Sequence, residues 1–292
     1  MAAVSAIANG RASGARNRQA GAASRRRRQR PRAWRVTIFV LAAIFFLGPL
    51  ICAFKFSLVL SNGSYGLGNY AQIVKNSAVR SSLITSLEIA GISAVVVVAL
   101  MLPTVVWVRL RRPRLTPVME GVTLLPIVIP PVVMAAGLEQ LQETAPQWLV
   151  NLMFNHPLTA LTPFYVVLSM PFTYRALDTG VRSIDLRTLV DASRNLGASW
   201  FSTLLRVILP NVQTAVLGAM FLTIALCLGE VVIASLLLYT TFPTELVALR
   251  LQDAVGVSVA LSMITLAFTF LLLFILSFLA ARRRGATSVR VL

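Results

Sequence analysis

The sequence predicts an all-α protein whose helices form a bundle within a membrane. Of its 292 residues, 57% are hydrophobic and only 13% are charged, whereas a soluble domain carries roughly 25% charged residues. The hydrophobic residues gather in six stretches, each at or near the length of about 20 residues that a helix needs to cross the hydrocarbon core. Because lipid offers no hydrogen-bond partners to the backbone, we expect each stretch to be helical.

The six predicted spans follow one another along most of the chain. They are Val36–Leu58, Leu83–Val108, Val118–Leu138, Thr159–Leu177, Val212–Tyr239 and Val257–Ala281. The first follows basic residues, as a signal peptide does, but its apolar run is long and no small-residue cleavage site follows it, so we expect a retained helix. The fourth is short and contains Pro163 and Pro171. We expect it to be kinked and buried among other helices, which satisfy the carbonyl groups that proline leaves free.

Much of the positive charge lies in a segment before the first span. The formal net charge is +17, and the first 35 residues contain ten arginines and no acidic residue. Their other residues are mainly Ala, Gly, Ser, Asn and Gln, which cannot bury a core, so we expect residues 1–33 to be a disordered basic cytoplasmic tail that contacts anionic lipid. A nucleic-acid arm would interleave aromatic residues, and only Trp34 is present here. We therefore expect no nucleic-acid partner.

Basic residues orient the predicted bundle with both termini in the cytoplasm. If the N-terminus is inside, the cytoplasmic segments hold the ten arginines of the tail, four in Arg109–Arg114, five in Arg175–Arg206 and four in Arg282–Arg290. The opposite face then holds only four of the 27 basic residues, namely Lys55, Lys75, Arg80 and Arg250. Loops rich in Lys and Arg stay on the cytoplasmic side, which supports this orientation.

The residues that commonly build metal or catalytic sites are scarce. Cys52 and Cys227 lie in separate apolar runs, and His156 is the single histidine of the sequence. These residues have no metal-ligand spacing and form no catalytic cluster, so we expect neither a metal site nor an enzyme. A phosphate-binding P-loop requires Gly-Lys-Ser/Thr, and neither Lys55 nor Lys75 follows a glycine.

The cytoplasmic segment Asp178–Asn211 is the most informative part of the sequence. It is too polar to cross the membrane and too poor in Gly and Ser to be a flexible linker. Apolar residues recur at helical spacing in its first half, with Leu186, Leu189, Val190 and Leu196 predicted to share one face.

A second short helix is predicted to follow a tight corner. Gly197 stands where a left-handed C-terminal cap favours glycine, and Ser199 suits the N-cap of the next helix. Pro210 ends that helix before the fifth span; its apolar residues are Phe201, Leu204, Leu205 and Ile208. The residues alone are equally consistent with a docking element for a cytoplasmic partner and with a connector that lies on the membrane surface.

The same segment resembles the EAA loop of binding-protein-dependent ABC permeases, which reads E-A-A, three residues, G, nine residues, I-x-L-P. The spacing matches throughout, and the departures are Asp for Glu, Ser for the second Ala and Val for Ile. The matching residues are Asp191, Ala192, Ser193, Gly197, Val207, Leu209 and Pro210. Other segments also look like this family, and the resemblance covers about residues 36–281: Asn69-Tyr70, Leu125-Pro126, Pro130-Pro131 and Pro171.

The resemblance implies a type I ABC importer permease fold in a bacterial inner membrane, with residues 34–284 as the permease domain and 285–292 as a short cytoplasmic tail. The segment 178–211 would be the coupling helix, which seats in a groove of a separate ATPase subunit. The chain would form half of the translocation pathway and bind no cofactor itself. The implied partners are two copies of the ATPase, which use ATP and Mg, a second and related permease chain, and an extracytoplasmic solute-binding protein.

Three residues are candidates for the substrate pathway: Glu230 in the fifth span, Glu88 in the second and Tyr174 at the end of the fourth. A charged side chain inside the membrane costs about 2.5–3.5 kcal/mol, so each carboxylate calls for an explanation. The alternative for each glutamate is a buried, hydrogen-bonded structural carboxyl, and for Tyr174 it is packing. Glu120 is expected to form an ion pair with the Arg109–Arg114 cluster.

The resemblance also suggests a substrate class. The Asn-Leu-Gly-Ala-Ser run at 195–199 looks like the polyamine, ferric-iron, thiamine and phosphonate branch, whereas sugar permeases of the family place Asp-Gly-Ala there. An acidic residue at Glu230 is similar to the polyamine type, so we expect spermidine, putrescine or a similar cation, with ferric iron, thiamine or a phosphonate as alternatives. A different class, an ion-coupled transporter acting alone, would need more intramembrane ion ligands and an inverted repeat.

Overall fold

The computed structural model describes residues 30–60, 62–252 and 254–287, and these residues fold into helices without a strand. A single isolated bridge joins Val59 and Tyr65. The chain divides into two compact units, residues 1–56 and 57–292. The expected basic tail falls mostly outside the described residues, as does the C-terminal end beyond Thr287.

The first unit consists, as far as it is described, of helix α2 (Arg30–Ser57), whose last residue already belongs to the second unit. Its stretch Trp34–Ser57 is long and apolar enough to cross a membrane, and that stretch is not buried. Large side chains such as Phe39, Phe45 and Phe46 are exposed around it. The retained apolar helix expected at Val36–Leu58 is therefore present.

The second unit begins with a turn that Asn69 and Tyr70 secure. Both residues lie in helix α3 (Gly68–Lys75). The Asn69 side-chain amide donates to the carbonyl oxygens of Ser57 and Val59, at 2.9 Å each, and the hydroxyls of Tyr70 and Ser57 lie 2.7 Å apart. The Asn69-Tyr70 pair singled out in the sequence thus fixes the start of this unit.

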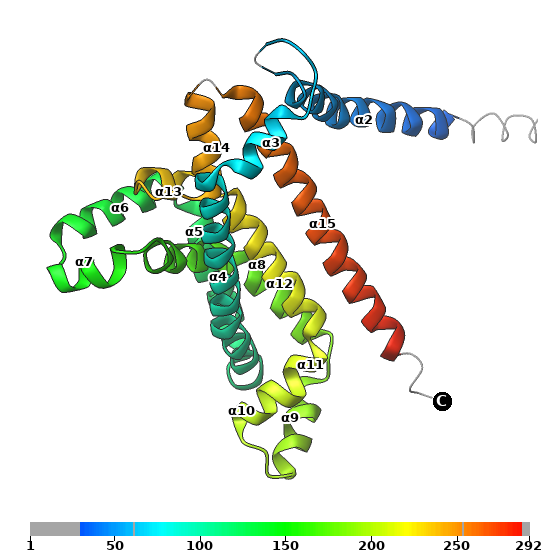
Figure 1. Ribbon diagram of the computed structural model, residues 1–292. Coiled ribbons are helices and arrows are strands. Elements are labelled where there is room, and N and C mark those ends of the chain that lie inside the picture. The colour runs from blue at the N-terminus through cyan, green and yellow to red at the C-terminus, as the bar shows by residue number, and fades with distance from the viewer. Residues whose placement is uncertain (1–29, 61, 253, 288–292) are drawn as a thin grey trace, which may run out of the picture. The chain divides into compact units, whose positions relative to one another are not determined.

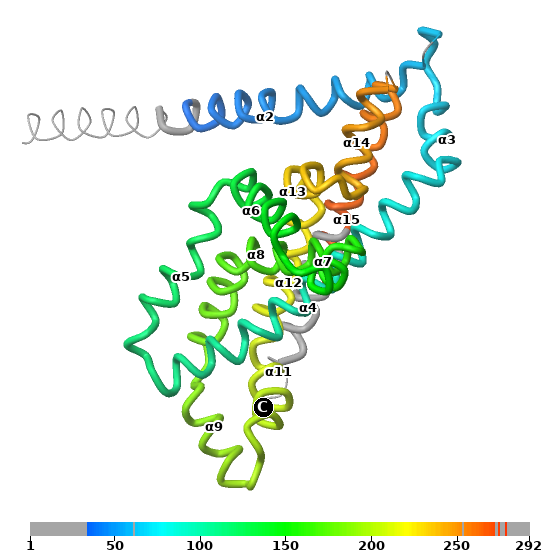
Figure 2. Tube along the Cα trace, turned by 90° about the vertical axis from the view of Figure 1, so that its left-hand side faces the viewer, coloured from blue at the N-terminus to red at the C-terminus, as the bar shows by residue number. Residues whose placement is uncertain are grey.

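Three long helices form the centre of the second unit: α4 (Ser77–Arg111), α8 (Pro157–Arg182) and α12 (Gln213–Gly229). They pack against one another and run side by side in Figures 1 and 2. Helix α8 stays α-helical through Pro163 and Pro171 and is longer than the expected span, and many of its side chains are buried. The prediction that this segment lies within a bundle is confirmed.

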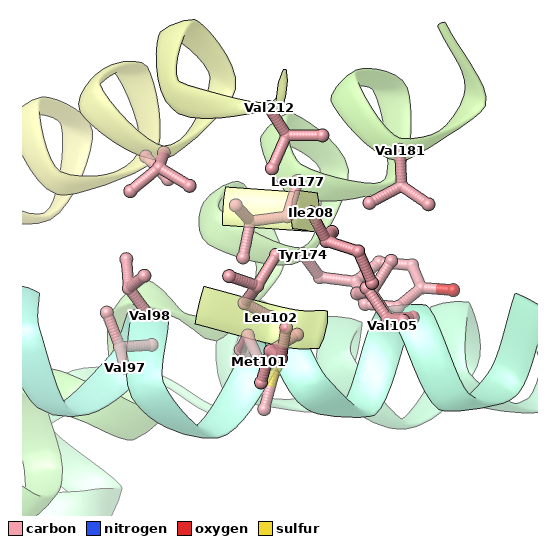
Figure 3. Packing of buried hydrophobic residues seen from close by; sticks show 14 of the residues in the cluster. Val97, Val98, Met101, Leu102, Val105, Tyr174, Leu177, Val181, Ile208 and Val212 are labelled. Carbon is pink, nitrogen blue, oxygen red and sulfur yellow. The ribbon is translucent and has the colours of Figure 1, made fainter. Parts of the chain in front are cut away.

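The largest core cluster joins these helices near one end. Val97, Met101 and Val105 of α4 meet Tyr174, Leu177 and Val181 of α8, as Figure 3 shows. Ile208 and Val212, which precede α12, fill the remaining side of the cluster. Burial of these apolar side chains holds the end of α4 against the segment that follows α8.

Two close contacts tie α8 to α12. The hydroxyl oxygens of Thr173 and Thr223 lie 3.2 Å apart, and both residues are fully buried. A Cβ placed on Gly180 would overlap the Ala215 side chain, so only glycine fits here without a shift of the helices. Small residues let helix backbones approach closely, and hydroxyl groups hydrogen-bond across them, as is typical of helix packing in membranes.

Two of the predicted spans are broken in the structure. The third becomes α5 (Thr116–Val128), after a 3-10 turn at Pro113–Leu115, and α6 (Pro131–Thr144), with a bend of 85°. Pro130 and Pro131 have no N–H to continue the helix, which explains this break. The fifth ends as a helix at Gly229, and a short helix α13 (Val232–Leu236) follows.

Outside the segment between α8 and α12, the remaining helices are α7 (Gln147–Phe154), α14 (Phe242–Leu251) and α15 (Val255–Thr287). The sequence predicted only the last of these three. Among the described residues, α2 and α4 alone are long and apolar enough to cross a membrane, and counting each bent helix pair as one span raises the number to at most four. The shorter apolar stretch Val255–Leu271 lies in α15. The count of six spans and the orientation of the termini stay predictions.

Candidate functional site: a helical elbow at one end of the bundle

The segment between α8 and α12 forms two short helical pieces that meet at a corner, which we call the elbow (Leu186–Asn211). It lies at one end of α4, α8 and α12, whereas α3, α13 and α14 lie toward the other end (Figure 1). Helix α9 (Leu186–Asn195) forms the first piece, and α10 (Trp200–Thr203), a π-helical turn (Leu204–Ile208) and α11 (Leu209–Asn211) form the second.

Local sequence explains the corner. Gly197 has φ +81°, the left-handed conformation that glycine adopts without steric cost. Its N–H donates to the Arg194 carbonyl at 2.9 Å, and the Ala198 N–H donates to the Ser193 carbonyl at 3.1 Å, which satisfies carbonyls at the end of α9. Ser199 Oγ accepts from the Ser202 N–H at 3.3 Å and caps α10. The predicted glycine corner and serine cap are confirmed.

One face of each piece of the elbow packs on the main core. Leu186 and Val190 of α9, together with Leu204 and Ile208 of the second piece, are buried in the cluster that includes Val105. Leu189 is half-buried. The elbow is therefore packed against the end of the bundle.

Part of the predicted apolar face is wrong. Leu196 is 88% exposed, because α9 ends at Asn195 and the chain turns at that point toward Gly197. Phe201 is 68% exposed and Leu205 is also exposed. Large apolar side chains thus project from the corner, which is typical of a surface that contacts another molecule.

The residues at the EAA positions divide into exposed and buried groups. Asp191, Ala192 and Gly197 are exposed, as is Pro210, and Val207 and Leu209 are partly buried. Ser193 is buried, and its hydroxyl lies 2.9 Å from that of Thr203. In the described residues Asp191 forms no ion pair. The structure brings these residues together on one elbow, which was expected from their spacing.

The π-helical turn was not predicted. The N–H of Leu209 reaches back to the carbonyl of Leu204, five residues earlier. Pro210 lacks an N–H and cannot bond to Arg206, which favours a widened turn at this point. The helix ends one residue after Pro210, and the chain then bends by 85° into α12.

An ion-pair network anchors the start of the elbow. Arg109 Nε of α4 donates to Asp178 Oδ1 of α8 at 2.7 Å, and Arg182 Nη2 lies 2.8 Å from Asp178 Oδ2. Glu120 of α5 lies 3.5 Å from Arg182. The expected pairing of Glu120 with the Arg109–Arg114 cluster is therefore wrong, because Arg182 of α8 is its partner. Both ion pairs of Asp178 were missed. The spacing of four residues between Asp178 and Arg182 could have indicated their pair, whereas no local signal indicates the pair of Asp178 with Arg109.

The three pathway candidates are not gathered into one site. Glu230 is 8% exposed and lies in the break after α12, where its Oε1 accepts from the Ile233 N–H at 2.9 Å and its Oε2 from the Tyr165 hydroxyl at 3.1 Å. Tyr174 is buried in the core cluster with Val105, and Glu88 is exposed on α4. The hydrogen bonds of Glu230 favour the structural alternative for this carboxylate.

In the described residues, no group of three or more His, Cys, Asp or Glu side chains is placed to hold a metal ion. Cys227 is buried in α12 and Cys52 is exposed on α2.

A bundle of apolar helices, some of them long enough to cross a membrane, is typical of an integral membrane protein. A family model described as a binding-protein-dependent transport system inner membrane component matches residues 91–285. The chain belongs to this family of ABC transporter permeases. Its members are transport subunits and generally not catalysts, and they work with an ATPase and a binding protein.

Individual relatives carry the same class of name. The chain is 30% identical over 223 residues to a probable molybdenum ABC transporter permease protein of Haloferax volcanii, which covers 74% of this chain and 79% of the relative. It is 26% identical over 216 residues to the spermidine/putrescine transport system permease protein PotC of Escherichia coli, with 73% and 77% covered. A probable ABC transporter permease protein of Sinorhizobium fredii is 30% identical over 189 residues, 62% of this chain and 33% of that relative.

Proposed function

We propose that this chain is the permease subunit of an importer, that it forms half of the translocation pathway, and that the elbow couples it to the ATPase. The observation that carries the proposal is the glycine-cornered helix pair, which presents Asp191, Ala192 and Gly197 at the end of the bundle. Its inner face is packed in the same core as α4 and α8. The elbow therefore combines an exposed surface for the ATPase with an inner face that packs on the membrane-spanning helices.

The proposed mechanism is mechanical. When ATP closes the two ATPase subunits, the groove that holds the elbow moves, and α9 transmits the displacement through Leu186 and Val190 to the core. The ion pair of Arg109 with Asp178 fixes the end of α4 to α8, so both helices move together. Exposed Asp191 is available to a basic residue of the ATPase, and a charge-assisted hydrogen bond there would fix the register of docking.

The proposed substrate is a polyamine or a similar small cation. The similarity to PotC supports it, whereas the relative from Haloferax volcanii is named for molybdenum. Glu230 adds little support, because both of its carboxylate oxygens already accept hydrogen bonds within the chain. Ferric iron, thiamine and phosphonates are the further candidates. Uptake of labelled spermidine and of molybdenum by cells that express the complete transporter would separate the first two.

The coupling role is tested by replacing Gly197 with valine in the complete transporter. A β-branched side chain at φ +81° is strained by roughly 1–3 kcal/mol, so the corner would open and the elbow would lose its fit to the ATPase. We expect co-purification of the ATPase and substrate uptake to fall together, while insertion in the membrane stays normal.

The matched control is Gly218→Val in α12, where φ is not positive and nothing lies within 4 Å of the added Cβ. It should retain both association and uptake. Normal uptake by Gly197→Val would overturn the coupling role, and uptake by this chain without any ATPase would favour the transporter that acts alone.

A further inference from the structure

A cavity of about 620 Å³ lies between the end of α4 and the elbow. Trp107, Arg111 and Arg112 line it from the α4 side, and Arg194 of α9 and Trp200 of α10 line it from the elbow. Its volume falls within the range of roughly 300–1,000 Å³ that is typical of sites for small ligands. The five lining residues include three cations, two indole rings and no acid.

The three guanidinium groups of the cavity have no counterion among the described residues, in contrast to Arg109 and Arg182. Arg109 and Arg182 are paired with Asp178, and Arg182 also lies near Glu120. In the part of the chain that the structure describes, Arg111, Arg112 and Arg194 form no ion pair. Three like charges around one cavity repel one another, and an anion placed among them would relieve this repulsion.

The three arginines also favour a ligand whose oxygens can accept paired hydrogen bonds from a planar guanidinium group. A guanidinium group offers several N–H donors in a fixed plane and matches the oxygens of a phosphate in bidentate fashion. Trp200 is held in place because it packs on the core cluster, and Trp107 is 48% exposed near the end of the span α4. Trp200 therefore gives the cavity one wall that belongs to the packed bundle.

We infer that this cavity is a binding site for the phosphate-bearing headgroup of an anionic phospholipid. Trp107 belongs to the last turns of α4, just before Arg111 ends the helix. Tryptophan at the end of a span lies at headgroup level, where its ring meets acyl chains and its N–H meets water. Basic pockets at the cytoplasmic ends of membrane helices are suited to lipids that carry more than one negative charge.

A headgroup in this position would connect the span to the coupling element. Arg111 is the last residue of α4 and Arg112 follows it, whereas Arg194 and Trp200 belong to the two sides of the corner. A bound phosphate would bridge these parts and stiffen the junction. The inference depends on the proposed function only for the side of the membrane on which the cavity opens.

The test measures lipid retention by the purified full-length chain in detergent, with native mass spectrometry. Cardiolipin, phosphatidylglycerol and phosphatidylcholine are titrated in turn against the wild type, the double variant R111Q/R112Q and the double variant R187Q/R206Q. The second double variant removes the same charge from exposed positions of the elbow that do not line the cavity. The arginines of the N-terminal segment are present in every variant, so their lipid binding cancels in the comparison.

We expect the wild type to retain the two anionic lipids in preference to phosphatidylcholine. Loss of one basic residue at the membrane surface weakens binding of an anionic lipid about fivefold, so R111Q/R112Q should bind cardiolipin roughly 25-fold more weakly. R187Q/R206Q should bind cardiolipin like the wild type. W107L should also weaken retention, since the indole ring contacts the headgroup region.

Three results would overturn the inference. The first is equal retention by the two double variants. The second is displacement of cardiolipin by millimolar inorganic phosphate, which would indicate a site for the free ion. The third is loss of ATPase association by R111Q/R112Q in lipid-free detergent, which would show that an acidic surface of the ATPase fills the cavity. Each result leaves the Gly197 test of coupling intact, so the two proposals fail separately.

Discussion

The hydroxyl groups of Ser193 in α9 and Thr203 in α10 lie 2.9 Å apart and are buried on the inside of the elbow. This contact joins α9 to α10 across the turn at Gly197. Ser193 stands where the EAA pattern has its second alanine, and the structure explains this departure, because the serine gains a partner on the opposite side of the corner. Thr203 also donates to the Ser199 carbonyl at 3.0 Å.

Removing this contact should loosen the elbow. In Ser193→Ala, Thr203 keeps its bond to Ser199, so no buried group is left unpaired and the loss is that of one hydrogen bond, about 1 kcal/mol. We expect a lower unfolding temperature and weaker retention of the ATPase. Ser202→Ala is the control, since among the described residues its hydroxyl has no hydrogen bond. Equal effects of the two variants would mean that the contact has no structural role.

The ion pair of Arg109 and Asp178 should contribute more than a surface pair does. Asp178 is buried, and in Arg109→Met it would keep only Arg182 as a partner. A buried carboxylate that loses its partner destabilises a protein by about 3–5 kcal/mol, and the second partner that remains here, Arg182, should reduce this loss. Thermal unfolding in detergent measures it. Arg114→Met, which changes an exposed arginine without an ion pair in the described structure, should have little effect.

The approach of α8 to α12 at Gly180 should tolerate no side chain. The Cβ in Gly180→Ala would overlap Ala215, and separating the helices would cost about 1–3 kcal/mol. The double variant Gly180→Ala/Ala215→Gly should recover most of that stability, because the space for one methyl group is restored. Gly121→Ala, with open space around its Cβ, serves as the control. A double variant no more stable than Gly180→Ala would contradict the contact.

The role of Glu230 can be decided by separating charge from hydrogen bonding. Glu230→Gln keeps an acceptor for the Ile233 N–H, whereas Glu230→Ala leaves this N–H and the Tyr165 hydroxyl without their acceptor. If the carboxylate is structural, Glu230→Ala should lower the unfolding temperature far more than Glu230→Gln does, at about 1–3 kcal/mol for each unsatisfied group.

The pathway alternative predicts a different outcome. There the negative charge itself attracts a cationic substrate, so Glu230→Gln would abolish uptake without changing thermal stability. Tyr165→Phe is a useful companion, because it removes the hydroxyl that bonds to Oε2 and leaves the carboxylate in place. If the carboxylate is structural, Tyr165→Phe should lower the unfolding temperature by a small part of the decrease seen with Glu230→Ala.

The positions of most helices follow from apolar runs, because burial in lipid requires continuous helix. The breaks within them were less evident. Pro130 and Pro131 indicate the break between α5 and α6 in the sequence. The break after α12 has no such signal: there the side chain of Glu230, in place of a backbone carbonyl, accepts the hydrogen bond of the Ile233 N–H. Helix α14 was missed because its residues were assigned to a loop between two spans.

The elbow was predictable where local chemistry determines conformation, as at Gly197 and Ser199. It was not predictable where tertiary contacts decide. Leu196 fits the periodicity of a buried face, yet the helix ends before it and the side chain is exposed. The partners Arg109 and Asp178 are 69 residues apart in sequence, and only the packing of α4 on α8 brings them together.

Helix α2 exposes apolar side chains on every side and has no polar stripe to mark an inner face. Because its surface is uniformly apolar, every rotation of the helix about its axis exposes the same kind of surface to lipid. The helix itself therefore sets no preferred rotation angle. Whatever protein surface it meets must choose that angle through shape alone. Single substitutions around its circumference should therefore leave transport unchanged on most sides of the helix and impair it on one. That side would be the one that contacts a neighbouring protein surface.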